Sequence, residues 1–156
     1  MEINGLKLPP SFLNAIREGI FHKEVGSWSL KRDVDAYGNP LETELAEVYG
    51  SKEKIIQATA ELNQHWKSDG CYGEPSEWSN APSFIPDIID FSKIVNFGMS
   101  ADGAPFCFDF RDNVENPSVI WWADVYWKRI APDFEAFVEL FDLSSGAYNA
   151  MQPTAK

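Results

Sequence analysis

The alternation of apolar and polar side chains is clearest in the C-terminal third of the chain, over residues 94–143. An apolar run at residues 93–99 predicts a strand, and the Asp-Gly pair within residues 100–104 predicts a tight turn, because glycine accepts positive φ without a Cβ clash. The next segment has a period of two, which predicts a half-buried antiparallel strand. One face carries Phe106, Phe108 and Phe110, and the other carries Cys107, Asp109 and Arg111.

Two further elements complete this part of the chain. The run from Ser118 to Trp127 is apolar on both faces until Asp124, which predicts a central strand. A helix is predicted to start with Pro132 near its first position and to end at residues 144–146, where Ser-Ser-Gly stands. Its apolar stripe follows helical spacing: Phe134, Phe137, Val138 and Phe141. We interpret the stripe as core packing against the sheet; the alternative is a helix that binds a partner's groove.

The N-terminal half is patterned less strongly. Helices are predicted over Pro9–Ile20 and, with Ser51 as N-cap, over Ser51–Lys67, where Ile55, Thr59, Leu62 and Trp66 share a face with Ile56 beside them. Residues 25–30 predict a short strand, residues 86–91 a helical turn, and residues 41–49 fit a strand or a helical turn equally well. Residues 68–86 form a long irregular stretch that contains Trp78, which is either a cover over the core or an interface anchor.

Composition is that of one folded domain. The chain has 156 residues, 44% hydrophobic and 14% aromatic, enough for a real core. These elements predict a single α+β domain over residues 1–146, with a mostly antiparallel or mixed sheet flanked by three to four helices, and a flexible tail over residues 147–156. Cys71 and Cys107 make no disulfide framework and are interpreted as thiols in a reducing cytoplasm. The start of the chain lacks the pattern of a signal peptide, and no run reaches membrane-spanning length.

Charge excludes some partners. The formal net charge is −11, which argues against nucleic-acid binding and against attachment to an anionic membrane through a basic surface. Residues 69–127 hold ten acids and two bases, a net of −8. This asymmetry is either an ordinary acidic surface or a face for a basic partner.

Candidate chemistry is sparse. His22 and His65 have no metalloprotease or zinc spacing, and no nucleophile elbow, phosphate-binding loop or dinucleotide fingerprint is present. Asp109, Asp112 and Glu115 match a glycosidase or metal site only by residue type. For Asp109 we prefer a structural role, in which it fixes the adjacent turn through loop amides. The sequence therefore predicts no enzyme, no cofactor and no metal; a hydrolase with scattered carboxylates is the remaining alternative.

Several motifs together resemble one family. They are Gly98-x-x-x-Asp102-Gly103-x-Pro105-Phe106-x-Phe108-Asp109, then Pro117-Ser118-Val119, then Ile130-Ala131-Pro132-x-Phe134-x-x-Phe137, and upstream Leu8-Pro9-Pro10-x-Phe12. This set resembles the SUKH superfamily, also called the cell-wall-assembly-regulator or killer-toxin-resistance family. The resemblance implies an α+β domain without catalytic activity. Bacterial members commonly serve as immunity proteins that bind a toxin domain, often a nuclease, and fungal members occur in regulators of cell-wall synthesis.

The resulting hypothesis is a non-enzymatic, cytoplasmic immunity-type protein that binds a cognate bacterial toxin domain. Its alternative is an intracellular regulatory or scaffold domain that binds an endogenous protein. Candidate contact residues are the acidic and aromatic side chains of the irregular stretch and the sheet: Trp78, Asp87, Asp90, Asp112, Glu115 and Asp124.

Overall fold

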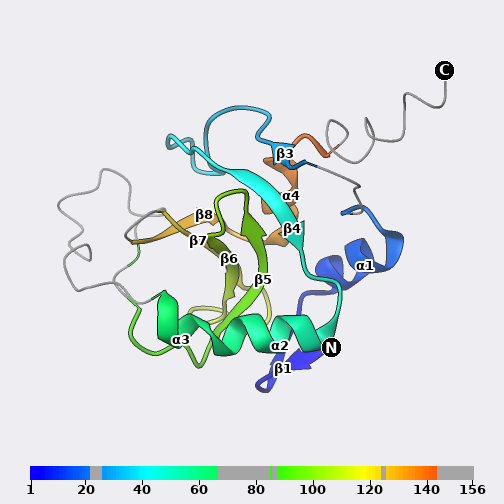
Figure 1. Cartoon of the computed structure of the whole chain (residues 1–156), viewed down its shortest axis with the longest axis vertical. Helices are drawn as coiled ribbons and strands as arrows, with labels where there is room; N and C mark the ends of the chain where they lie inside the picture. The colour runs from blue at the N-terminus through cyan, green and yellow to red at the C-terminus, as the bar shows by residue number, and fades with distance from the viewer. Residues whose placement is uncertain (22–25, 67–84, 86–87, 124–125, 144–156) are drawn as a thin grey trace.

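The structure is a computed structural model, and it describes residues 1–21, 26–66, 85, 88–123 and 126–143. The chain forms an α+β domain whose main feature is a curled six-stranded sheet (Figure 1). The strands stand in the order β3-β4-β5-β6-β7-β8, and every neighbouring pair is antiparallel. Their bounds are β3 Trp28–Ser29, β4 Glu44–Val48, β5 Ile94–Ser100, β6 Pro105–Asp109, β7 Ser118–Trp122 and β8 Trp127–Ala131.

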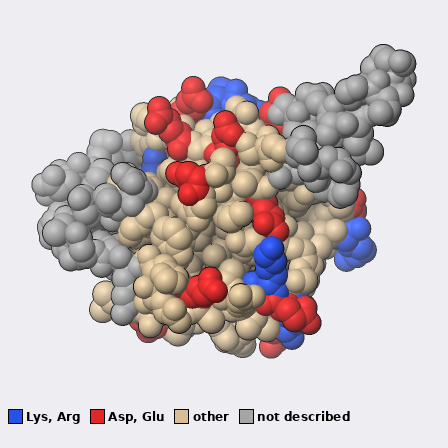
Figure 2. All heavy atoms as spheres, in the orientation of Figure 1, with Lys and Arg blue, Asp and Glu red and all other residues tan. Residues whose placement is uncertain are grey.

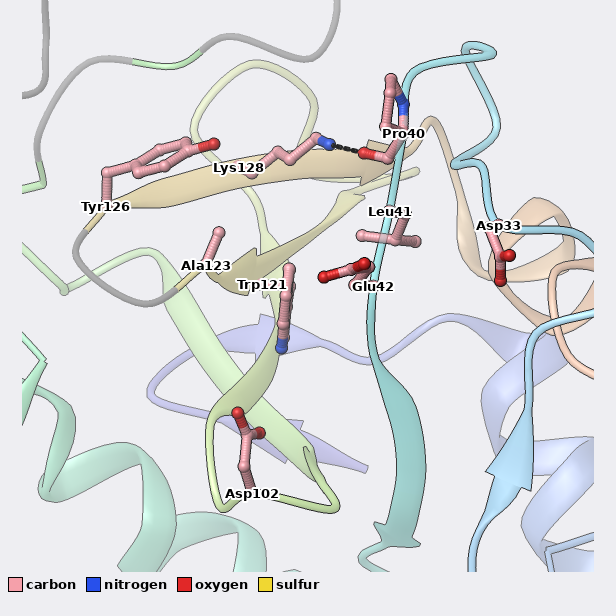
Figure 3. Close-up of a pocket in the computed structure, with 9 residues that line it drawn as sticks. All are labelled: Asp33, Pro40, Leu41, Glu42, Asp102, Trp121, Ala123, Tyr126 and Lys128. Carbon is pink, nitrogen blue, oxygen red and sulfur yellow. Dashed lines mark hydrogen bonds between the residues drawn. The ribbon is translucent and has the colours of Figure 1, made fainter.

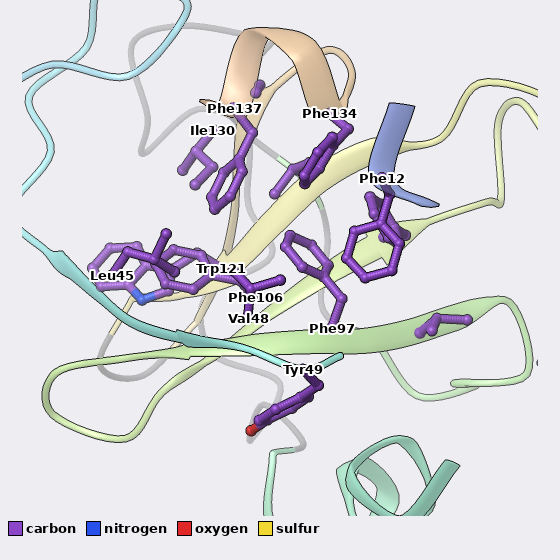
Figure 4. Packing of buried hydrophobic residues seen from close by; sticks show 14 of the residues in the cluster. Phe12, Leu45, Val48, Tyr49, Phe97, Phe106, Trp121, Ile130, Phe134 and Phe137 are labelled. Carbon is purple, nitrogen blue, oxygen red and sulfur yellow. The ribbon is translucent and has the colours of Figure 1, made fainter. Parts of the chain in front are cut away.

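Two helices from opposite ends of the chain pack on one face of the sheet. They are α1, Pro10–Glu18, and α4, Phe134–Glu139, and the short hairpin of β1, Glu2–Ile3, and β2, Leu6–Lys7, precedes them. Phe12 of α1 makes edge-to-face contacts with Phe97, Phe108 and Phe134, with ring centroids 5.4–5.7 Å apart. Figure 4 shows this aromatic centre, in which Phe137 also lies over Phe97. The family-like motifs at the two ends of the chain therefore meet in one core.

The other face of the sheet is covered by α2, Lys52–Ala60, and α3, Leu62–His65. Figure 1 shows these two helices following one another along the lower part of the view. Thr59 ties α2 to the sheet, since its hydroxyl accepts a hydrogen bond of 3.0 Å from the N–H of Asn96. Leu62, Ile88 and Trp127 belong to a second apolar cluster on this face.

This second cluster corrects the prediction that β6 is half-buried. All five residues of β6 are buried, and Cys107 and Asp109 on the face away from the phenylalanines are 0% and 3% exposed. The period of two is correct, with Phe106 and Phe108 in the first cluster and Cys107 in the second. The error arose because α3, together with Ile85, Ile88 and Phe91, covers the face that the local pattern assigned to solvent.

The predicted strand 118–127 is two strands. β7 ends at Trp122, and the N–H of Ala123 donates a 2.7 Å hydrogen bond to the carbonyl of Tyr126 before β8 begins at Trp127. The segment between has no glycine or proline, so the sequence carried no turn signal there. β7 is central, as predicted, because it pairs with both β6 and β8.

Helix ends also differ from the predictions. In α4 the N-cap is Asp133, whose carboxylate accepts from the N–H of Ala136 at 2.8 Å, so Pro132 precedes the helix. The helix ends at Glu139 instead of residues 144–146, and Phe141 instead forms a bridge with Leu30. Residues 88–91 form no helical turn.

The predictions for the N-terminal half are mostly confirmed. Gly19, at φ 71°, ends α1, and Ser51 caps α2 by accepting from the N–H of Lys54 at 3.1 Å. The helix predicted over 51–67 is interrupted at Glu61, which separates α2 from α3. Ile56 is 45% exposed, so it does not share the buried face. The undecided residues 41–49 contain β4.

Candidate functional site

Three of the six contact residues proposed from sequence can be placed in the structure. Trp78, Asp87 and Asp124 lie outside the described residues. The described ones are exposed: Asp112 pairs with Arg129 at 3.2 Å, whereas Asp90 and Glu115 line two different surface depressions. The N–H and the side chain of Ser92 bind the Asp90 carboxylate and hold its pKa below the usual value.

A different acidic site is formed where the sheet curls. A pocket of about 430 Å³ lies between the loop that joins β3 to β4, the β5–β6 turn and the β7–β8 hairpin (Figure 3). Three exposed carboxylates from two distant segments line it: Asp33, Glu42 and Asp102. Its other lining residues are Pro40, Leu41, Trp121, Ala123, Tyr126 and Lys128. The volume falls in the ~300–1,000 Å³ range of ordinary ligand pockets.

The β3–β4 loop is held in place over β8. The N–H of Ala36 donates to the carbonyl of Ile130 at 2.9 Å, which covers the outer edge of the last strand. Asp35 organises the loop from within, because its buried carboxylate accepts from the N–H groups of Tyr37 and Asn39 at 2.8 and 3.0 Å. The N–H of Leu41 then donates to the carbonyl of Asp33 at 3.0 Å. Asp33 and Glu42 thus stand at opposite ends of a loop that is closed on itself.

The third carboxylate is placed by the β5–β6 turn. The N–H of Gly103 donates to the carbonyl of Ser100 at 2.9 Å, and Gly103 has φ 92°, a conformation that glycine adopts readily. The hydroxyl of Ser100 donates to the carboxylate of Asp102. The N–H of Ala101 joins this turn to β4, since it donates to the carbonyl of Glu44 at 2.9 Å. The turn that sequence predicted therefore also aims Asp102 at the pocket.

Trp121 forms the aromatic wall of the pocket. It is 8% exposed and stacks on Phe106 with centroids 6.3 Å apart. Its indole Nε1–H is buried without a hydrogen-bond acceptor. Figure 3 shows the indole between Glu42 and Asp102, with its nitrogen at the end that faces Asp102. A buried donor that has no acceptor lowers the stability of the folded state by about 1–3 kcal/mol.

Lys128, the one cation among the described lining residues, is already engaged. Lys128 donates to the carbonyl of Pro40 at 2.6 Å and lies 3.5 Å from the buried carboxylate of Asp35. No Lys or Arg of the described part of the chain forms an ion pair with Asp33, Glu42 or Asp102. Figure 2 shows Asp and Glu side chains gathered on the part of this face that β4 and the preceding loop occupy in Figure 1. The pocket consequently carries negative charge that the described residues leave unbalanced.

Three other titratable residues, Asp109, Cys107 and His65, do not line the pocket. Asp109 accepts from the N–H of Arg111 at 3.0 Å and from its guanidinium twice at 2.9 Å, and Arg129 lies 3.8 Å away. This is the turn-fixing role preferred from sequence. Burial raises the pKa of the Cys107 thiol well above its usual value. His65 is exposed in α3, and no three His, Cys, Asp or Glu side chains in the described ranges lie close enough together to hold a metal ion.

Sequence reasoning missed most of the pocket. Asp33 and Glu42 stand outside the strongly acidic segment 69–127, and Trp121 was interpreted only as a strand residue. The Asp-Gly turn signalled where Asp102 would be, but nothing local to it pointed to the β3–β4 loop. No helix in the described ranges is long and apolar enough to cross a membrane.

The sequence model of one protein family, the SMI1 / KNR4 family (SUKH-1), matches residues 2–140 of the chain. No curated protein and no solved structure matches the chain.

Proposed function

Because this chain belongs to the SMI1 / KNR4 family (SUKH-1), we propose that it is a protein-binding domain without enzymatic activity. We propose further that it is a cytoplasmic immunity protein, which binds and neutralises a cognate bacterial toxin domain. The family match spans both the N-terminal motif at α1 and the C-terminal motif at α4, which share one core.

The acidic pocket is the observation that carries this proposal. Asp33, Glu42 and Asp102 surround an aromatic wall, and no Lys or Arg of the described residues forms an ion pair with them. Nuclease toxins are basic because they bind phosphate, so an acidic inhibitor gains both faster association and selectivity toward them. The net charge of −11 also attracts a basic partner from longer distances.

The buried carboxylates support a binding role rather than catalysis. Asp35 and Asp109 are both bound by backbone N–H groups and by cationic side chains, so their oxygens are occupied by contacts that hold the fold. Cys107 is a free, buried thiol, which suits a reducing cytoplasm.

An immunity gene is expected to lie beside the gene of its toxin. The experiment is therefore co-purification of the tagged chain from its native host, followed by calorimetry and a growth assay with any toxin domain that is encoded beside it. We expect nanomolar affinity that weakens as salt rises, and protection of cells that express the toxin. A variant with Asp33→Asn, Glu42→Gln and Asp102→Asn should bind at least about tenfold more weakly.

Glu18→Gln is the matched control, since Glu18 is exposed at the end of α1 and outside the pocket. Recovery of endogenous proteins alone, with no binding to the neighbouring toxin domain, would overturn the immunity proposal. That result would favour the regulatory or scaffold alternative.

A further inference from the structure

We propose that the acidic pocket receives an arginine side chain from a protein segment of the partner, whose peptide carbonyl accepts the hydrogen bond of the Trp121 indole. This inference rests on the proposed function only in requiring a protein partner. It assigns the ligand chemistry of the pocket, which the proposed function leaves open.

The arrangement of the carboxylates suits a guanidinium. Asp33 and Glu42 come from the β3–β4 loop and Asp102 from the β5–β6 turn, so they surround the pocket instead of converging on a point. Groups of three ligating side chains close enough for a metal ion are absent from the described residues, which makes a bound divalent cation a poor fit. Arginine presents five N–H donors in a planar fork and can bridge carboxylates that are several ångströms apart.

The unpartnered indole selects a peptide over a free cation. Trp121 is nine-tenths buried, lines the pocket and holds a donor without an acceptor. Neither an arginine side chain nor a polyamine has an acceptor, but every peptide unit carries a carbonyl. The indole Nε1 of Trp121 has almost no exposed surface. The partner's peptide carbonyl therefore reaches Nε1 only after a flanking side chain changes rotamer. Glu42 and Asp102 are exposed, and such side chains change rotamer within nanoseconds.

The aromatic wall favours arginine over lysine. The guanidinium is planar and weakly hydrated, and it stacks on aromatic faces, whereas the ammonium of lysine is compact and strongly hydrated. Trp121 and Tyr126 both line the pocket. Lys128 already occupies the Asp35 side of the pocket, so the incoming cation meets Asp33, Glu42 and Asp102 instead.

The test is a titration of the full-length protein followed by NMR at the Trp121 indole N–H, which the Trp121→Phe variant assigns. The probes are N-acetyl-arginine amide, N-acetyl-lysine amide (free side chain), N-acetyl-citrulline amide and agmatine. Only the first combines a guanidinium with peptide carbonyls. We expect a saturable shift of this signal with the arginine probe, and an affinity for each other probe that is weaker by at least about threefold.

Single variants then locate the contact. Glu42→Gln and Asp102→Asn, both at exposed positions, should each weaken binding of the arginine probe about threefold, and Glu18→Gln should not change it. Equal binding of arginine and citrulline probes, or an indole signal that no probe moves, would overturn the inference. Agmatine binding as tight as the arginine probe would overturn the role of the carbonyl and identify a free-cation site.

The two proposals fail separately. If the arginine probe binds and the neighbouring toxin domain does not, the pocket chemistry stands and the immunity function falls. If the toxin domain binds with the same affinity to the wild type and to Glu42→Gln and Asp102→Asn, the function stands and the pocket inference falls.

Discussion

Replacing Asp109 tests whether this motif residue supports the fold or faces a partner. Its carboxylate is 2% exposed and lies between two guanidinium groups, those of Arg111 and Arg129, which are 30% and 20% exposed. In Asp109→Ala the two cations lose their buried counter-charge, and the N–H of Arg111 loses its acceptor. We therefore expect a loss of stability with no direct effect on partner contacts.

The magnitude follows from three hydrogen bonds and their burial. Hydrogen bonds to charged groups contribute about 1.5–3 kcal/mol each, and breaking a buried ion pair by removing one partner destabilises by about 3–5 kcal/mol. Because the two arginines are partly exposed, water can replace some of the hydrogen bonds that their guanidinium groups lose. We expect Asp109→Ala to lower the free energy of unfolding by about 3 kcal/mol. Asp109→Asn retains an acceptor for the Arg111 N–H and should lose about 2 kcal/mol.

The assay is urea unfolding followed by tryptophan fluorescence, with the slope of the transition checked for constancy. Asp112→Asn is the matched control, because Asp112 pairs with the same Arg129 but its side chain is 82% exposed, and it should change stability by less than about 0.5 kcal/mol. The double variant Asp109→Ala, Arg111→Met should be less destabilised than the sum of the single variants. A loss below about 1 kcal/mol in Asp109→Ala, or weaker partner binding at unchanged stability, would refute the structural role.

Three further outcomes are expected. Gly98→Ala places a Cβ 2.5 Å from the carbonyl oxygen of Glu47, so it should lower the free energy of unfolding, measured in urea, by about 1–3 kcal/mol. Gly50→Ala, with its nearest neighbour at 3.7 Å, should not lower it, and equal effects would contradict the close approach of β4 and β5. In a Cys71→Ser background, Cys107 should resist thiol reagents at pH 8 until the protein unfolds, because burial raises the pKa of its thiol. Prompt labelling of the native protein would show that the apolar cluster around Cys107 opens in the folded state. Burial raises the pKa of Tyr49 to about 12, so the neutral phenol is favoured in the folded state; stability should be unaffected below pH 10 and should fall as pH rises toward 12. In an absorbance titration, Tyr49→Phe should remove a tyrosine that ionises near pH 12, and an unchanged titration in that variant would count against the assignment.

The sequence by itself determined the elements whose signals are local. The Asp-Gly turn between β5 and β6, the Ser51 cap of α2 and the phenylalanine alternation of β6 each depend on residues a few positions apart, and all three are present. Local backbone sterics and hydrogen bonding decide such features, so they can be inferred without knowing the partner elements. The motifs at both ends of the chain likewise indicated the family and the α+β class.

Only the tertiary structure decided which surfaces are covered and which side chains converge. The second face of β6 is buried by α3 and by Ile85, Ile88 and Phe91, and the apolar run after Ser118 reverses between β7 and β8 without a glycine or proline. The pocket depends on the same long-range packing: the β3–β4 loop closes over β8, and this brings Asp33 and Glu42 to Trp121 and Asp102, which are 60 to 88 residues away in sequence. Side-chain convergence depends on how the sheet curls and on which loops pack across it, and no pattern within a single segment encodes that geometry.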